Sequence, residues 1–351
     1  MPVASTTSRL DHLDALRGLL VLLVVAIHAL GYAGLPAGPA RTTIDFIVST
    51  IAVQGFYFVD GLLFARRIDR AGGPGARGYL ADSARRLLWP WLLFSVGYAV
   101  ARAAAERYGV VEPTALSQDG LSPAALLGSI WWSHAAPHLY FLPSLFLIRC
   151  AAVVIWPLLR APAAVLLVVG TVALLAFRTV IEPGYFALVP HEGLDPLLHA
   201  LGGMGFFVLG AGMWRLAGET GRLSAAWIIG PLILAGVSVF APRSVHNVAV
   251  QLGYLLPLYA LFARYSIGGA AMTMVGRQTM GIYLLHMPIV MKIWAMILGR
   301  LVDPAGLLDY FLLVATSFAT ALAISLATHR IGLGALVFGE RKAAPRLTPA
   351  A

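Results

Sequence analysis

Long apolar segments constrain this chain more than any other feature of its sequence. A helix needs roughly 20 mainly apolar residues to cross the hydrocarbon core of a bilayer. Ten segments meet this requirement: 13–33, 42–64, 87–105, 138–158, 162–180, 197–214, 224–242, 245–263, 278–298 and 308–328. In lipid, backbone polar groups must be satisfied within the protein, so such segments form helices. We therefore expect an all-α integral membrane protein, a bundle of about ten transmembrane helices.

The composition supports the same fold class. Of the 351 residues, 59% are hydrophobic and only 12% are charged, whereas soluble domains carry roughly a quarter charged residues because their surfaces face water. No polar stretch is long enough to form a soluble domain. We expect a single transmembrane domain over residues 1–338, followed by a disordered cytoplasmic tail at 339–351 that is rich in Ala and Pro.

The basic residues predict the orientation of the bundle. The 65–86 loop holds six arginines, and cytoplasmic loops carry an excess of Lys and Arg. Alternating outward from this loop places both termini in the cytoplasm, with sixteen basic residues inside and four outside. We expect a multipass protein of the plasma (inner) membrane, with membrane lipid as its surroundings.

The net charge of +9 does not indicate nucleic-acid binding, because the arginines lie singly between apolar runs and form no solvated stripe. One cysteine, Cys150, excludes an intramolecular disulfide and any Cys-based metal cluster. The sequence also has no His/Asp metal spacing and no Gly-rich phosphate loop. We expect no bound metal, no bound cofactor and no nucleic-acid partner.

The first apolar segment carries the strongest chemical candidates. Ionisable residues at membrane depth cost several kcal/mol, so each is a candidate for function. Arg17 and His28 are eleven residues apart, so they project from one helix face about 16 Å apart along the axis. Asp14 lies three positions before Arg17 and can pair with it. Spacing alone leaves another interpretation open, in which the arginine reaches the interface and the histidine bonds to a neighbouring helix.

Three further ionisable residues lie at or near membrane depth. His286 is in the middle of the ninth segment, where it has either a functional role or a buried structural hydrogen bond. His138 lies at the outer mouth of the fourth segment and is either functional or interfacial. Arg149 is mid-membrane, where an unpaired cation is least tolerable, so it needs an ion-pair partner or an anionic ligand.

The first helix resembles the opening helix of the acyltransferase family 3 proteins. Their signature there is a basic residue, ten intervening residues and a histidine, in the context Leu-Asp-x-x-Arg-Gly. Here it is Leu13-Asp14, Arg17-Gly18 and His28. Four further segments resemble the family in the same order: GFYFVDGL at 55–62, RRLLWP at 85–90, PHLYFLP at 137–143 and GRQTMGIYLLH at 276–286.

The resemblance implies an O-acyltransferase that uses acyl-CoA, usually acetyl-CoA, as a co-substrate. The acceptor implied is a hydroxyl of an envelope glycan or a similar molecule. A hydroxyl needs a base, so His28 would deprotonate it or carry the acyl group covalently. Arg17 would stabilise the thioester oxygen or hold the phosphates of the donor. Arg85 and Arg86 either bind those phosphates or only set the orientation of the loop.

One position departs from the family pattern, which has Ser-Gly where this chain has Asp60-Gly61. Asp60 lies near the cytoplasmic end of the second segment. We expect it either to pair with Arg66 or Arg67 or to orient an active-site arginine or histidine.

These residues predict an internal cleft lined by Arg17, His28 and His286 and open to the cytoplasm beside Arg85 and Arg86. Donor and acceptor would then enter from opposite faces. The chief alternative is a secondary transporter or lipid translocator that uses buried His, Arg and Asp, although such proteins often show inverted repeats and none is evident here. A membrane sensor is a second alternative, weakened by the lack of an attached soluble domain in this sequence.

Overall fold

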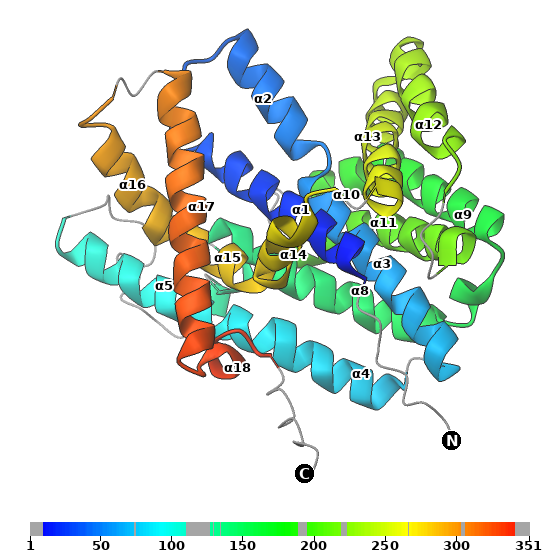
Figure 1. Ribbon diagram of the computed structural model, residues 1–351, viewed down its shortest axis with the longest axis horizontal. Coiled ribbons are helices and arrows are strands. Elements are labelled where there is room, and N and C mark those ends of the chain that lie inside the picture. Colours follow the sequence, from blue (N-terminus) through cyan, green and yellow to red (C-terminus); the bar gives the residue numbers. More distant parts are fainter. Residues whose placement is uncertain are drawn as a thin grey trace.

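The computed structural model describes residues 10–73, 75–109, 127–128, 130–133, 135–188, 195–218, 223–265, 267–302 and 306–340. Over these ranges the regular structure is helical and contains no strand (Figure 1). Nine helical stretches in the described ranges are long and apolar enough to cross a membrane: Asp11–Ala29, Pro39–Ala71, Ala76–Arg107, Pro137–Ile155, Ala163–Tyr185, Pro196–Ala217, Arg243–Tyr265, Thr279–Leu298 and Leu307–Arg330. The prediction of an all-α membrane bundle is confirmed.

Four of the nine stretches are single α-helices: α1 (Asp11–Ala29), α11 (Pro196–Ala217), α13 (Arg243–Tyr265) and α17 (Leu307–Arg330). The others are assembled from consecutive pieces. They are α2 (Pro39–Ser49) with α3 (Ala52–Ala71); α4 (Ala76–Ser83), η1 (Ala84–Leu88) and α5 (Trp89–Arg107); η2 (Pro137–Tyr140) with α8 (Phe141–Ile155); α9 (Ala163–Ala176), η4 (Phe177–Ile181) and α10 (Glu182–Leu188); and α15 (Thr279–Leu285), η7 (His286–Val290) and α16 (Met291–Leu298). The shorter elements are η3 (Leu158–Arg160), α12 (Ala226–Val237), η6 (Ser238–Phe240), α14 (Gly269–Arg277) and α18 (Gly334–Val337).

The seventh predicted segment, 224–242, is shorter than expected. Its helical part is α12 followed by η6, over Ala226–Phe240. At 1.5 Å per residue this stretch is about 22 Å long, which is less than the roughly 30 Å of a hydrocarbon core. It packs along α13, the helix that follows it. The structure therefore has nine long stretches and one short apolar hairpin arm in its described part.

Close backbone contacts set the positions of the helices that matter for the site. A Cβ added to Gly61 of α3 would lie 1.9 Å from the carbonyl oxygen of Phe207 in α11. A Cβ on Gly276 of α14 would lie 1.7 Å from the carbonyl oxygen of Asp14 in α1. Small residues let membrane helices approach this closely. Close helix packing therefore requires glycine at position 61, and this requirement is the same whether Ser or Asp precedes it.

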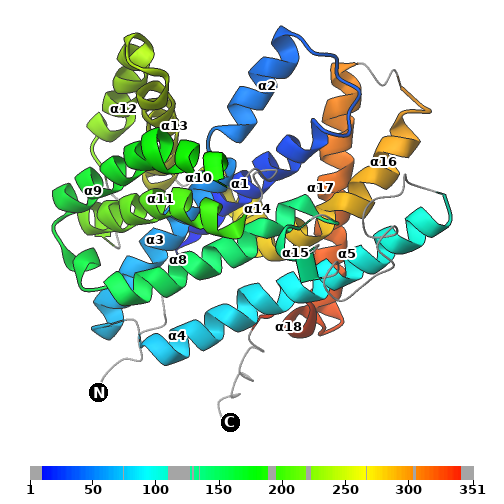
Figure 2. The ribbon, with the colours of Figure 1, turned by 180° about the vertical axis from the view of Figure 1, so that it is seen from behind.

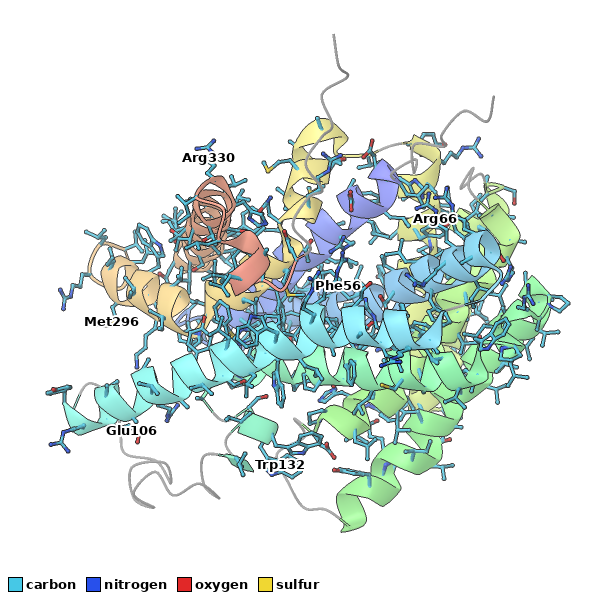
Figure 3. The ribbon with its side chains drawn as sticks, turned by 90° about the horizontal axis from the view of Figure 1, so that it is seen from below. Phe56, Arg66, Glu106, Trp132, Met296 and Arg330 are labelled. Carbon is cyan, nitrogen blue, oxygen red and sulfur yellow. The ribbon has the colours of Figure 1, made fainter. Side chains whose placement is uncertain are left out.

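Ion pairs join neighbouring helices near their ends. Asp11 pairs with Arg277 at 3.0 Å, and Asp69 of α3 pairs with Arg215 of α11. In Figure 3, Phe56 lies near the middle of the bundle, whereas Arg330 and Met296 lie at its edge.

The carboxyl-terminal helix α18 lies against the start of α5. The Trp89 indole of α5 donates to the carbonyl oxygen of Leu336 in α18 at 2.6 Å. In Figures 1 and 2, α18 and α4 lie at the lower edge of the bundle and α2 at the upper edge. The predicted tail lies outside the described residues from position 341 onward.

Candidate active site

Three histidines from distant parts of the chain meet at one point in the bundle. His28 comes from the last turn of α1, His138 from η2 and His286 from the start of η7. The ring centroids of His28 and His286 are 5.3 Å apart, those of His138 and His286 5.1 Å, and those of His28 and His138 6.0 Å. The sequence identified these three candidates separately, and the structure brings them together.

Breaks in helical geometry position two of the three rings. Pro137 opens the short 3-10 turn that carries His138. After His286 the helix is interrupted, because Met287 has extended dihedral angles (φ −141°, ψ 164°) and Pro288 has no N–H to donate. The interruption lets His286 end one helix with its ring turned toward α1 and η2.

The hydrogen bonds of His286 define its tautomer. Its Nδ1 lies 2.8 Å from the carbonyl oxygen of Tyr283 and 3.1 Å from that of Ile282. Carbonyl oxygens only accept, so Nδ1 carries the hydrogen, and Nε2 of the neutral ring is an acceptor. The side chain is fully buried, and Nε2 has no hydrogen-bond partner among the described residues.

His138 and His28 differ in accessibility. His138 is 2% exposed. One of its ring nitrogens faces the carbonyl oxygen of Leu284 without reaching normal hydrogen-bond geometry. This carbonyl oxygen accepts from the Tyr98 hydroxyl at 2.6 Å. His28 is partly exposed, whereas the other two rings are buried.

Tyrosines fix the backbone around this cluster. The Tyr283 hydroxyl donates to the carbonyl oxygen of His138, and the Tyr310 hydroxyl donates to that of Ala26 at 3.1 Å. Sequence reasoning missed these residues and Tyr98. Tyr283 was detectable, because it lies one helical turn before His286 in the segment that resembles the family. Nothing in the sequence singles out Tyr98 or Tyr310.

Arg17 lies at the other end of α1. Its guanidinium is 3.3 Å from the Asp14 carboxylate, as the sequence predicted, and Asp14 also lies 3.6 Å from Arg277. Between Arg17 and His28 the same helix face carries Val21 and Val24, which are 0% and 3% exposed. The predicted cleft along this face is therefore wrong for the described residues, because packed valines fill it.

Arg149 forms a buried ion pair with Asp60. Its Nε donates to Oδ2 at 2.9 Å and its second terminal nitrogen donates to Oδ1 at 2.5 Å, a bidentate arrangement. A third bond reaches the Ser83 hydroxyl at 3.3 Å. Of the two possibilities for Arg149, the structure has the ion pair. The expectation that Asp60 pairs with Arg66 or Arg67 is wrong.

Distance along α3 explains the correction at Asp60. Asp60 contacts α8 through Arg149. Arg66 and Arg67 lie nearly two turns, roughly 9–10 Å, further along α3, and their guanidinium groups lie over aromatic rings. The Arg67 guanidinium is 5.0 Å from the centroid of the Tyr79 ring, and that of Arg66 is 6.0 Å from the Trp214 ring. These rings belong to α4 and α11.

A cavity of about 290 Å³ lies beside this ion pair. Three arginines and two aspartates line it together with apolar and hydroxyl side chains: Asp60, Leu63, Phe64, Arg67, Tyr79, Asp82, Ser83, Arg86 and Arg149. Arg86 thus joins Arg149 and Asp60, while Arg85 is exposed on η1 and does not line the cavity. The excess of one positive charge suits an anionic ligand.

The described residues include no group of His, Cys, Asp and Glu arranged to hold a metal ion. A family model described as an acyltransferase domain matches residues 10–330. The matched range includes the three histidines, Arg17 and the Asp60–Arg149 pair. No curated protein and no solved structure matches the chain.

Proposed function

Because this chain belongs to acyltransferase family 3, we propose that it transfers an acyl group, usually acetyl, from acyl-CoA to a hydroxyl of an envelope glycan or a similar acceptor. The observation that carries the proposal is the meeting of His28, His138 and His286 at the end of α1. The cluster supplies unpaired ring nitrogens in a buried site, which is what hydroxyl activation needs.

In this proposal His28 is the base, because it is the partly exposed histidine of the three. It takes the proton of the acceptor hydroxyl as the oxygen attacks the thioester carbon. The C–S bond breaks, an ester C–O bond forms, and CoA leaves as the thiol with the proton that His28 accepted. An acyl-histidine intermediate is the alternative route to the same products.

His286 orients His28 in this mechanism. Since the Nδ1–H of His286 is held by the carbonyls of Tyr283 and Ile282, its Nε2 is available only to accept. We propose that it accepts the N–H of His28, whose other nitrogen then faces the acceptor hydroxyl. This is the arrangement of a catalytic base held by a third group.

His138 takes the third role. One nitrogen of its neutral ring carries a hydrogen that makes no hydrogen bond of normal geometry to a described residue, and the carbonyl oxygen of Leu284 lies beside the ring. We propose that this N–H donates to the thioester oxygen as negative charge develops there. Arg17 does not take this role, since it lies about 16 Å from His28 along α1.

The donor is proposed to arrive at the cytoplasmic face. The cavity beside Arg67, Arg86 and Arg149 and the Arg17 cluster are candidate contacts for its phosphates. Both termini are proposed to be cytoplasmic in the plasma (inner) membrane, supported by the contact between Trp89 and Leu336, which joins α18 to the end of the bundle that carries the loop arginines. Reporter fusions after residue 75 and at the carboxyl terminus should both report a cytoplasmic location.

The function is tested with purified protein in detergent. Release of CoA thiol from acyl-CoA by the wild type, lost in His28→Ala, supports acyl transfer. The alternative of a secondary transporter or lipid translocator predicts no thiol release by either protein. In proteoliposomes with acyl-CoA on one side only, acylation of an acceptor supplied only on the other side supports entry from opposite faces. Acylation only when both share a side contradicts it.

A further inference from the structure

The chain turns back on itself after α17. From Gly334 to Glu340 it forms α18 and a short segment that lie against the end of α17, the start of α5 and η1 (Figures 1 and 2). We call residues Gly334–Glu340 the strap. The family model matches residues 10–330, so the strap follows the matched acyltransferase domain. Its role therefore has to be inferred from its own contacts.

Buried contacts hold the strap in place. Phe338 is 1% exposed, and its ring stacks on that of His329 with 5.3 Å between the centroids. The tip of the same ring would lie 3.2 Å from a Cβ added to Gly281 of α15. The carbonyl oxygen of Leu336 accepts from the Trp89 indole. A fully buried phenylalanine is a substantial apolar anchor, so the strap is a packed part of the protein.

Gly339 brings the strap into direct contact with η1. Its φ is +66°, in the left-handed region that favours glycine. A Cβ added here would clash with the carbonyl oxygen of Arg85. The next residue, Arg86, lines the cavity of about 290 Å³ beside Arg149. The strap and the cavity thus contact η1 at consecutive residues.

The conformation of η1 affects the shape of that cavity. The segment Ala84–Leu88 is a π-helix between α4 and α5, and π-helical turns are rare and occur frequently at functional sites. A change in this turn would move the Arg86 side chain relative to Arg149 and Asp60, which belong to other helices. A contact that fixes the backbone at Arg85 therefore also fixes Arg86 at the cavity.

An ion pair closes the strap. The Nδ1 atom of His329 lies 2.8 Å from the carbonyl oxygen of Ser325, and its Nε2 lies 2.9 Å from the Glu340 carboxylate. Both neighbours are acceptors, so a ring that donates to both carries a hydrogen on each nitrogen. A neutral ring with its hydrogen on Nδ1 would turn an acceptor toward the carboxylate. The latch between His329 and Glu340 therefore forms only while His329 is protonated.

Few other titratable or charged groups lie on the elements that the strap contacts. In the described part of the last turns of α17, the first turns of α5, α15 and η1 they are Arg330, Tyr283, Arg85 and Arg86. Arg330 is exposed, and the Tyr283 hydroxyl already donates to the carbonyl oxygen of His138. Glu340 is thus the one carboxylate in this set, and the proton of His329 decides whether the latch joins opposite charges.

We propose that the strap regulates the proposed donor site through this latch. While His329 is protonated, the latch holds η1 and keeps Arg86 at the cavity that receives the phosphates of acyl-CoA. Loss of the proton releases Glu340 and lowers the affinity for acyl-CoA, whereas Phe338 stays buried, so α15 and the chemical step do not change. In the proposed orientation the strap is cytoplasmic. The inference rests on the proposed function and adds to it control of donor binding by cytoplasmic pH.

The first test compares two glycines that both have positive φ. Gly339→Ala should push the strap off η1, because the added methyl group meets the carbonyl oxygen of Arg85. Gly332→Ala is the matched control, since its φ is +79° but no atom lies within 4 Å of an added Cβ. The two variants bear similar backbone strain, so the difference between them reports the contact with η1. The KM and kcat of thiol release from acyl-CoA are measured for each, with thermal unfolding in detergent.

We expect Gly339→Ala to raise the KM for acyl-CoA at least tenfold and to leave kcat within threefold. Gly332→Ala should change neither by more than twofold. Equal effects of the two substitutions, or a lower kcat with unchanged KM in Gly339→Ala, would overturn the role of the strap. If Gly339→Ala does not fold, Glu340→Ala adds no atom and decides the question through the pH profile.

The second test is the dependence of KM on pH. Histidine changes its charge between about pH 5 and 8, so the latch is present at the acidic end of this range and lost at the alkaline end. The wild-type KM should rise about two- to fivefold over the range, the size expected for a partly exposed ion pair. Glu340→Ala should have the higher KM throughout. Glu340→Gln should keep the lower KM at both ends, because its amide can donate to Nε2 of the neutral ring or accept from the protonated one.

Three results would contradict these expectations. A KM that still rises with pH in Glu340→Ala, or a Glu340→Gln profile that follows the wild type, would overturn the latch. Failure of the wild type to release thiol from any acyl-CoA would overturn the proposed function itself, and the regulation with it.

Discussion

The two ends of α1 hold the two residues of its motif, and they differ in how their polar groups are satisfied. At the Arg17 end every described charge that we have named has a partner: Asp14 with Arg17 and Arg277, and Asp11 with Arg277. At the His28 end, Nε2 of His286 and both nitrogens of His138 have none within the described ranges.

We interpret this difference as a division of roles between the two ends of α1, one contributing to stability and the other to the reaction. An unsatisfied buried polar group costs about 1–3 kcal/mol, so a cluster that keeps several of them has a use for them, which we propose is the reacting substrate. The ion pairs at the Arg17 end are partly exposed, and ion pairs of this kind contribute about 0–1 kcal/mol to stability. In our proposal, the His28 end is the site of catalysis and the Arg17 end is a place of encounter with the donor.

The largest expected effect is that of His28→Ala. Loss of a general base lowers the rate by about 10²–10⁴-fold, so acyl transfer and thiol release should both fall by that factor in kcat. The variant should elute and melt like the wild type, since His28 makes no hydrogen bond to a described residue. Activity within threefold of the wild type would remove the distinction between the two ends.

Asp60→Ala should strongly lower the stability of the protein. It leaves the Arg149 guanidinium buried without its bidentate partner, and breaking a buried pair costs about 3–5 kcal/mol. The measurement is thermal unfolding in detergent. The double variant Asp60→Ala/Arg149→Met removes both charges and should recover more than half of the loss. If Asp60→Ala unfolds like the wild type, the pair is not a structural element.

His286→Ala should lower kcat by about 10–100-fold, because it removes the acceptor that holds His28 in the productive tautomer. His286→Gln is the sharper variant, since its amide oxygen can accept an N–H and should restore at least part of the activity. A structural role alone predicts that both variants lose stability and that neither restores kcat. Thermal unfolding measured in parallel distinguishes these outcomes.

Arg17→Ala should show the smallest effect on the chemical step. We expect the KM for acyl-CoA to rise about 10- to 100-fold, because a hydrogen bond to a charged group contributes about 1.5–3 kcal/mol. The kcat should stay within threefold. A fall in kcat as large as that of His28→Ala would place Arg17 at the reacting atoms and contradict the separation of the two ends.

The sequence by itself determined the fold class, the family and the short list of chemical residues. Apolar runs of this length form helices in lipid, so nine of the ten predicted spans follow from the sequence, and the segment 224–242 is shorter than predicted. The eleven-residue spacing of Arg17 and His28 likewise fixed their shared face and their separation along α1.

Only the tertiary structure decided which residues meet. Helical periodicity gives the direction of a side chain and its height, but it does not say which helix lies opposite. That is decided by close backbone contacts such as Gly61 against Phe207 and Gly276 against Asp14. These contacts gave Asp60 a partner in α8, packed Val21 and Val24 where a cleft was expected, and joined His28, His138 and His286 from segments more than a hundred residues apart.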